Sequence, residues 1–346
     1  MGGERLAAQG SDCVVRSEDL SVMGLTEVIG KLPAVFRALA TLQREVGRRR
    51  PDAAVLIDFP DFHSVLSRGL RKRGIPLIYY VPPAVWAWRP GRARVIAERA
   101  RRILTLFSFE TEIYRRFGAD AVWTGHPIVE DVHDGLAAGP GPLPAKSRPR
   151  LALLPGSRRA EVRRCWPPLR EAAAQLARRR GVEAFVVRAP GLTEDLYPGA
   201  EEAGVRILTS GIHALLASAD LALVASGTAT LEAALCGAPM VVVYRASKTN
   251  YAIGRRLVRV PWISPVNILA REEVVPELLQ DDLTQERLRR EAEDLLDSHE
   301  RRERMRRGYD RVARELGPPG ASARAAEAVI ETLGGAGRAP ARTARR

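Results

Sequence analysis

Short apolar segments alternate with amphipathic segments along most of this chain, in two blocks joined by a Gly- and Pro-rich linker at residues 135–150. Such alternation is typical of parallel sheets covered by helices. We predict strands at residues 54–58, 76–81, 103–107 and 121–125 in the first block, and at 151–155, 184–188, 205–209, 221–225 and 240–244 in the second. The chain is therefore expected to be an α/β protein with two doubly wound, Rossmann-like domains.

The length of 346 residues agrees with two domains. We place the first at residues 1–143 and the second at 144–333, with the last helices free to pack back on the first domain. The Gly-, Ala- and Arg-rich end, residues 334–346, is expected to be a disordered basic tail.

Composition restricts the class of function. The net charge is +13, but the arginines alternate with acids along the predicted helices, and no aromatic platform or clustered basic groove for nucleic acid is evident. Three widely spaced cysteines favour a reducing cytoplasm over a disulfide framework or a zinc site. No apolar run approaches the roughly 18 residues of a membrane span, and the start lacks a signal-peptide core.

The segment Ala219–Leu235 is an apolar strand pattern that breaks at a Ser-Gly-Thr turn and restarts at once as a helix. Glycine allows close backbone approach, and the unpaired N–H groups and dipole of a new helix favour an anion. Glu232, early in that helix, can accept hydrogen bonds from sugar hydroxyls, although it can also merely offset the helix dipole. The predicted phosphate seat consists of Ser226, Gly227, Thr228, Ala229 and Thr230.

A second strand-turn-helix places Gly156, Ser157 and Arg158 beside another predicted helix N-terminus. We expect Arg158 to meet a phosphate group. The alternative, an arginine paired with Glu161 on the helix surface, is expected for Arg159 more than for Arg158.

Two carboxylates flank a proline turn after the 54–57 strand. An ionised carboxylate within reach of a hydroxyl can take its proton, so we predict that Asp58 is a general base. The alternative role is to cap the helix expected to begin near Ser64, and we assign that role to Asp61.

Three further polar residues are weaker candidates for a site. Asn267 and His126 lie in loops after apolar segments, although a lone histidine such as His126 is more often structural. The loop that begins at Arg188 is a candidate pocket for a nucleobase.

Nine segments resemble the lipid-A-disaccharide synthases, in the same order along the chain. They are LSVMGLTEVI (20–29), IDFPDF (57–62), VPPAVWAWRPGR (81–92), FETEIYRRFG (109–118), TGHP (124–127), LLPGSRRAEV (153–162), ASGTATLEAAL (225–235), PMVVVYR (239–245) and NILA (267–270). The combination of VWAWRPGR, PGSRRAEV and SGTATLE is specific for that family, although none of the three is specific alone.

The resemblance implies a GT-B glycosyltransferase with two facing Rossmann-like domains. Its donor is UDP-2,3-diacylglucosamine, its acceptor is 2,3-diacylglucosamine 1-phosphate, and it releases UDP with inversion at the anomeric carbon. Donor contacts are implied for Arg158, the 226–230 turn, Glu232 and Asn267, and the role of base for Asp58. No cofactor or metal is expected, because helix N-termini and arginine can stabilise the departing diphosphate and no Asp-x-Asp motif is evident.

Acylated substrates also favour a membrane role for the apolar segment 20–36, which carries flanking Lys31, Arg37 and Arg44 like an interfacial helix. Core packing is the alternative. We expect peripheral attachment to the anionic cytoplasmic face of the inner membrane, and a homo-oligomer is left open. The expected contacts are Val22, Met23, Leu25, Val28, Ile29, Leu32, Val35 and Phe36.

The chain departs from the family pattern at its start. Family members have a strand, a Gly/Ser-rich loop, a helix and a second strand before the segment that matches GGERLAAQG here. The lack of this unit is expected to expose apolar strand edges and weaken acceptor binding, and a misassigned start codon is the favoured explanation. Two alternatives stay open: another UDP-sugar transferase or epimerase of this architecture, and a truncated, inactive protein that binds only UDP or membrane.

Overall fold

The computed structural model describes residues 1–17, 20, 25–87, 90–247, 251 and 260–334, with the backbone alone for residues 5 and 25–31. Two compact units divide the described chain, one formed by Met1–Thr124 with the C-terminal helix and the other by most of the chain from Gly125 to Ala321. The first unit ends before the expected boundary at residue 143, because helix α6 (Ile128–Ala137) packs on two helices of the second unit. The tail expected from residue 334 lies, beyond Gly334, outside the described residues.

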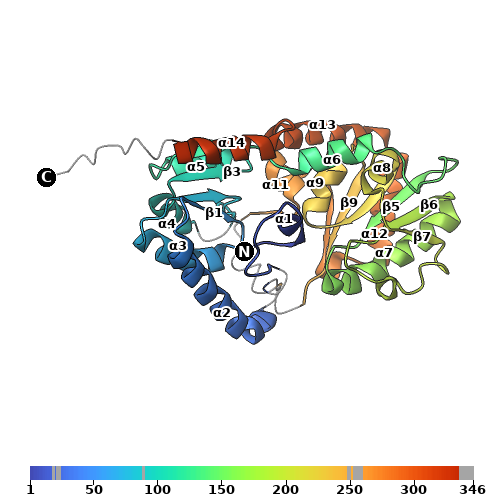
Figure 1. Cartoon of the computed structure of the whole chain (residues 1–346). Helices are drawn as coiled ribbons and strands as arrows, with labels where there is room; N and C mark the ends of the chain where they lie inside the picture. Colours follow the sequence, from blue (N-terminus) through green and yellow to red (C-terminus); the bar gives the residue numbers. More distant parts are fainter. Residues whose placement is uncertain (18–19, 21–24, 88–89, 248–250, 252–259, 335–346) are drawn as a thin grey trace. The chain divides into compact units, whose positions relative to one another are not determined.

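A four-stranded parallel sheet of order β1-β2-β3-β4 forms the centre of the first unit (Figure 1). The strands are β1 (Ala54–Ile57), β2 (Leu77–Tyr80), β3 (Arg102–Thr105) and β4 (Ala121–Trp123). The helices are α1 (Glu4–Ala8), α2 (Leu25–Arg49), α3 (Pro60–Lys72), α4 (Arg92–Arg99), α5 (Ser108–Arg115) and α14 (Ala321–Gly334). Side chains that alternate along the strands face two cores, one shared with α2 and α3 and the other with α14.

A six-stranded parallel sheet of order β10-β9-β8-β5-β6-β7 forms the centre of the second unit. The strands are β5 (Arg150–Leu154), β6 (Glu183–Val187), β7 (Val205–Leu208), β8 (Leu221–Ala225), β9 (Met240–Tyr244) and β10 (Glu277–Leu279). The α-helices are α6, α7 (Arg159–Arg180), α8 (Ile212–Ser218), α9 (Thr228–Leu235), α11 (Pro265–Ala270), α12 (Gln285–Asp297) and α13 (His299–Leu316), with short 3-10 turns at Glu194–Leu196 and Gln280–Asp282. β5 and β8, at the middle of the sheet, are buried along their whole length, as continuous apolar runs require.

The strand β1 is an edge of the first sheet among the described residues. Leu56 on it is 3 % exposed, whereas Val55 and Ile57 are 41 % and 48 % exposed. Apolar side chains are thus uncovered at this edge of the sheet as the described residues form it.

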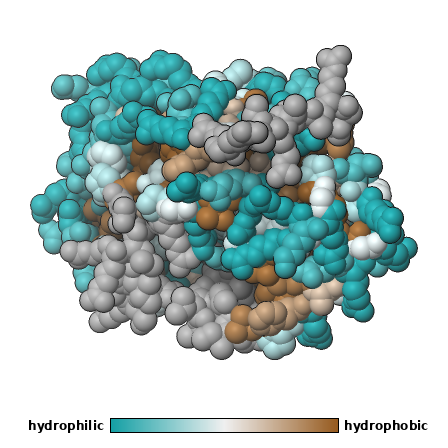
Figure 2. Space-filling view, turned by 90° about the vertical axis from the view of Figure 1, so that its left-hand side faces the viewer, coloured by the Kyte–Doolittle hydropathy of each residue, from teal (hydrophilic) through white to brown (hydrophobic). Residues whose placement is uncertain are grey.

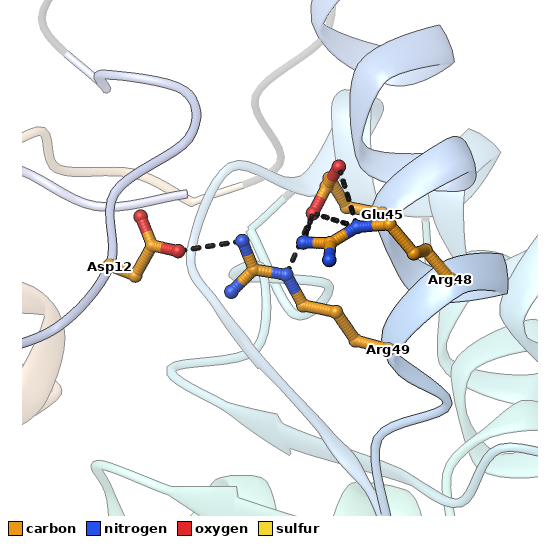
Figure 3. Close-up of polar contacts among 4 residues, drawn as sticks. All are labelled: Asp12, Glu45, Arg48 and Arg49. Atoms are coloured by element: carbon orange, nitrogen blue, oxygen red, sulfur yellow. Dashed lines mark hydrogen bonds and ion pairs between the residues drawn. The ribbon is translucent and has the colours of Figure 1, made fainter.

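The long helix α2 is tied to the N-terminal segment through its C-terminal turn (Figure 3). Arg49 donates to Asp12 at 2.6 Å and to Glu45 at 2.7 Å, and Arg48 donates to the same Glu45 oxygen at 2.7 Å. The hydrogen bonds from Arg48 and Arg49 lower the pKa of Glu45 to about 2. These arginines also suit the negative end of the helix dipole.

The side chains expected to touch a membrane are only partly described. Val22 and Met23 lie outside the described residues, and of Leu25, Val28 and Ile29 only the backbone is described. The exposed members are Leu32, 40 % exposed, and Phe36, 65 % exposed. Val35 instead packs partly against the core, because it lies on the inward side of α2.

A buried carboxyl group joins α5 to the loop after β2. Glu110 is 3 % exposed, and its oxygens accept hydrogen bonds from Trp86 Nε1 at 2.9 Å and from the Phe107 amide at 3.4 Å. Burial raises the pKa of Glu110 to about 7, because few water molecules solvate the charged form. The group therefore titrates near neutral pH in the folded protein.

Because the folded pKa of Glu110 exceeds its unfolded value, its stabilising contribution is complete below about pH 4.5 and is lost as the pH rises through about 7. We expect this group to lower the free energy of unfolding by at most about 3 kcal/mol between those limits. Urea unfolding at pH 5 and pH 8 should show a smaller pH dependence for Glu110→Gln than for the wild type. Glu112→Gln, on the exposed side of the same helix, is the control. An equal change in the free energy of unfolding between pH 5 and pH 8 for all three proteins would refute the titration of Glu110 in this range.

Candidate active site

The turn from β8 into α9 carries the polar residues that the sequence predicted to bind a phosphate group. Gly227 is the N-cap of α9 with φ 156° and ψ −164°, a conformation essentially restricted to glycine. Ser226 Oγ donates to the Ile263 carbonyl at 2.9 Å, and Thr230 Oγ1 donates to the Gly227 carbonyl at 2.7 Å. Thr228 is exposed, whereas Thr230 is fully buried. The first N–H groups of α9 therefore begin directly after the carboxyl end of β8, a position that suits an anion.

A second glycine turn follows β5 in the same sheet. Gly156 has φ 122°, and a Cβ there would lie 2.7 Å from Glu161 Cβ, so this position excludes a side chain. Glu161 accepts from the Ser157 amide at 3.3 Å and from Arg158 Nη1 at 2.7 Å. Its carboxylate thus fixes the turn that opens α7.

The pairing at this turn differs from our expectation. Arg158, not Arg159, pairs with Glu161, while Arg159 contacts Thr193 at 3.3 Å and Asp195 at 3.5 Å. The reason is geometric, because residues three apart at a helix start face each other whereas residues two apart do not. The Arg158 side chain is 52 % exposed, and an exposed pair of this kind is weak enough to exchange partners.

Glu232 lies one turn into α9 and has a histidine neighbour that the sequence did not suggest. His213 Nε2, on α8, is 3.8 Å from Glu232 Oε1, and both side chains are largely buried. Gly135 on α6 permits this arrangement, since a Cβ there would lie 1.9 Å from His213 Nδ1. Only tertiary packing brings these three helices together, so no local sequence pattern could have revealed the pair.

Asn267 is fully buried and its amide is committed to the protein. Nδ2 donates to the Val275 carbonyl and to Glu277 Oε1, each at 2.9 Å, and Oδ1 accepts from the amides of Val274 and Val275 at 2.8 and 2.9 Å. The expectation that Asn267 contacts a ligand directly is therefore not supported, because all its hydrogen-bonding groups are used.

Glu277 is the residue behind this network that sequence reasoning missed. Its oxygens accept from the amides of Ile263 and Ser264, at 3.0 and 2.9 Å. Asn267 and Glu277 together hold the loop whose Ile263 carbonyl accepts from Ser226. The pair positions the glycine turn from behind.

The two remaining candidates in the second unit have local structural roles. Burial lowers the pKa of His126 to about 4, so its ring is neutral, and Nδ1 accepts from the Ile128 amide at 3.0 Å near the start of α6. Arg188 Nη1 donates to the Leu192 carbonyl across the loop after β6. Neither observation tests a contact with a ligand.

Asp58 ends β1 in the first unit and lies in a strained turn. Asp58 and Phe59 have φ values of 49° and 46°, in the left-handed region that costs non-glycine residues about 1–3 kcal/mol each. The Asp58 carbonyl accepts from His63 Nδ1 at 2.6 Å and from Tyr79 Oη at 3.4 Å. Burial lowers the pKa of His63, which keeps the ring neutral. The Asp58 side chain itself is exposed.

The assignment of Asp61 as a helix cap is wrong. The helix α3 begins at Pro60, earlier than expected, so Asp61 lies inside its first turn and Phe59 occupies the N-cap position. Proline is favoured at this first position because its fixed φ suits a helix and because an N–H at this position would have no acceptor within the helix. Asp61 pairs with Arg92 at 2.5 Å.

Solved structures of similar fold define the class of protein. MurG from Acinetobacter baumannii is 16 % identical with a TM-score of 0.55, over 94 % of this chain and 87 % of that one. UDP-GlcNAc 2-epimerase from Neisseria meningitidis, bound to UDP-GlcNAc, is 10 % identical with a TM-score of 0.59, over 92 % and 84 %. The calicheamicin glycosyltransferase CalG4 is 18 % identical with a TM-score of 0.56, over 94 % and 83 %. At these identities the likeness shows the fold, which is GT-B.

Sequence relatives define the family within this class. The model of the lipid-A-disaccharide synthetase family matches residues 1–330. The lipid-A-disaccharide synthases of Myxococcus xanthus and of Anaeromyxobacter sp. strain K are 42 % and 41 % identical, each over 96 % of this chain and 89 % of the relative. The chain belongs to the lipid-A-disaccharide synthase family and is a glycosyltransferase.

Removal of the Asn267 amide tests its positioning role. Asn267→Ala removes the partner of the Val275 amide and one hydrogen bond each from Glu277 and the Val274 amide, so we expect the free energy of unfolding to fall by about 2–3 kcal/mol. Denaturant titration measures this loss. Gln285→Ala, at the exposed start of α12, should change it by less than about 0.5 kcal/mol, and equal stability of both variants would contradict the proposed network.

Proposed function

We propose that this protein transfers 2,3-diacylglucosamine from UDP-2,3-diacylglucosamine to 2,3-diacylglucosamine 1-phosphate, releasing UDP and a β-1,6-linked disaccharide phosphate. The observation that carries the proposal is the glycine turn at Ser226–Thr230, which opens α9 directly after the carboxyl end of β8 in a chain of this family. A turn of this kind suits the diphosphate of a nucleotide sugar.

The donor contacts are assigned to groups of the second unit. The first N–H groups of α9 hold the diphosphate, and Arg158 leaves Glu161 to pair with it, since arginine binds phosphate oxygens in a fork geometry. Glu232 accepts hydrogen bonds from the ribose hydroxyls. As UDP departs, these donors stabilise the growing negative charge.

The base is assigned to Asp58 of the first unit. Its exposed carboxylate accepts the proton of the acceptor 6-hydroxyl while that oxygen attacks the anomeric carbon, and the bond to UDP breaks on the opposite face. The configuration is therefore inverted in one step. His63 and Tyr79 hold the Asp58 backbone, which limits the motion of the carboxylate.

Substitution of the base separates catalysis from donor binding. Asp58→Asn is expected to lower kcat by about 10²–10⁴-fold, the usual contribution of a general base, with an unchanged dissociation constant for UDP. UDP release with both lipid substrates measures kcat, and calorimetric titration measures UDP affinity. Asp52→Asn, an exposed carboxylate before β1, is the control. Full activity of Asp58→Asn, or loss of UDP affinity in it, would remove Asp58 from this role.

The same assay separates this reaction from others of the same architecture. Activity with UDP-GlcNAc that lacks acyl chains would favour a different UDP-sugar enzyme. UDP binding without UDP release, in the presence of both lipid substrates, would favour an inactive binding protein.

We propose that α2 attaches the protein to the cytoplasmic face of the inner membrane. Its exposed Leu32 and Phe36, with Arg37 and Arg44 on the same helix, suit an anionic lipid surface. Within the described residues, no helix has the length and hydropathy needed to cross a membrane.

Flotation with vesicles that contain phosphatidylglycerol tests this attachment. The double variant Leu32→Ser, Phe36→Ser should float several-fold less than the wild type, because burial of the two side chains in lipid contributes to binding. Phe117→Ser removes another exposed phenylalanine of the first unit and serves as the control. Equal flotation of the two variants, or no flotation of the wild type at low salt, would refute the role of α2.

A further inference from the structure

A cavity of about 190 Å³ lies in the first unit between α3 and α4. The sheet residues Leu56, Leu77 and Tyr79 line it on one side, and Val95 and Ile96 of α4 on another. Four of these five side chains are purely apolar. Binding of an apolar ligand in a cavity of this kind is favourable, because apolar surface on both sides is removed from water.

Arginines stand among this apolar lining. Arg68, Arg92 and Arg99 all line the cavity. Arg99 Nη1 donates to the Ser64 carbonyl at 2.9 Å and to Ser67 Oγ at 3.2 Å, which fixes the guanidinium at this place. The combination of an apolar space and cationic groups fits an amphiphile with an anionic head group.

The positive charge at this cavity is only partly neutralised. Arg92 pairs with Asp61, but no carboxylate of the described chain pairs with Arg68 or Arg99. Burial, together with repulsion from Arg68 and Arg71, lowers the pKa of Arg99. An anion placed here would relieve that repulsion.

The cavity borders the strand end that carries the proposed base. Pro60, which lines it, is the first residue of α3 and follows Asp58 by two positions. Tyr79, also in the lining, donates its hydroxyl to the Asp58 carbonyl. The cavity therefore adjoins the turn that carries Asp58, although Asp58 does not line it. Helices α3 and α4 lie at the left of Figure 1, and the face of the molecule that is turned to the viewer in Figure 2 mixes teal hydrophilic and brown apolar residues.

We propose that this cavity holds one acyl chain of the acceptor lipid, with the acceptor phosphate on the surrounding arginines. The inference rests on the function proposed above and assigns its acceptor subsite. The volume suits part of one chain and not two, so the second acyl chain lies outside it. The subsite accounts for selection of an acceptor that carries both a phosphate and an acyl chain.

Direct binding of dodecyl phosphate tests the subsite without catalysis. We expect saturable binding to the wild type by calorimetry, with at least tenfold weaker binding of inorganic phosphate and of dodecanol. Val95→Phe and Ile96→Phe fill the cavity from α4 and should each weaken dodecyl phosphate about tenfold. Arg68→Gln should weaken it several-fold and reduce its salt dependence. Val95 is 36 % exposed, so its variant adds little strain if Ile96→Phe fails to fold.

Arg94→Gln is the matched control, because Arg94 lies on the same helix, is exposed, and pairs with Glu98 away from the cavity lining. Its affinity for dodecyl phosphate should equal that of the wild type. In steady-state assays, the filled variants should raise the KM for acceptor about tenfold with unchanged kcat and donor KM.

The outcomes separate this inference from the proposed function. Equal dodecyl phosphate affinity in the wild type and both filled variants would overturn the subsite, whatever the activity. If the variants lose dodecyl phosphate but the wild type releases no UDP, the site for an acyl phosphate stands and the proposed reaction fails. If the filled variants lose binding to phosphatidylglycerol vesicles and keep their acceptor KM, the occupant is a membrane phospholipid and the acceptor assignment is overturned.

Discussion

The backbone conformation at Gly227 is the constraint on which the proposed donor site depends. Because only glycine adopts this conformation at low cost, the chain passes from β8 into α9 without an intervening loop. The helix N-terminus then lies at the carboxyl end of β8, where its first N–H groups have no partner within the helix and suit the anion proposed for this site. Ser226 fixes the turn from one side through the Ile263 carbonyl. A Cβ at position 227 would meet no atom within 4 Å, so a side chain there is disfavoured by the backbone conformation alone.

The support behind this turn comes from a buried polar network. Glu277 accepts hydrogen bonds from two backbone amides and from one side-chain amide. Asn267 uses both its donor and its acceptor atoms in the same network. A network that is satisfied in this way holds one geometry, since any shift would leave a buried polar group without a partner. Asn267 thus supports the proposed donor turn through its protein contacts, and its own amide contacts the protein.

The sequence predicted nine strands and the two glycine turns because these features depend on local patterns of apolar residues and glycine. β10 escaped prediction because only two of its three residues are apolar, which is too short a run to form a strand pattern. His213 and Glu277 were missed because their partners are set by tertiary packing. The role of Asp61 was misjudged because α3 begins four residues earlier than expected, and the partner of Arg158 was misjudged because residues three apart face each other at a helix start. Side-chain partners at a helix start change with such a shift, whereas the strand ends that carry the site do not.

The two units reach a tight strand-to-helix turn by different means, and the difference bears on Asp58. The second unit uses glycine at Gly156 and Gly227, where the left-handed or extended-positive conformation costs little. The first unit places Asp58 and Phe59 in the left-handed region at a cost of about 1–3 kcal/mol each. Contacts of the Asp58 carbonyl with His63 and Tyr79 offset part of that cost. Glycine at position 58 would remove the strain but also the carboxylate. A strained aspartate at a strand end, where glycine would adopt the same conformation at lower cost, agrees with the role of base proposed for its carboxylate.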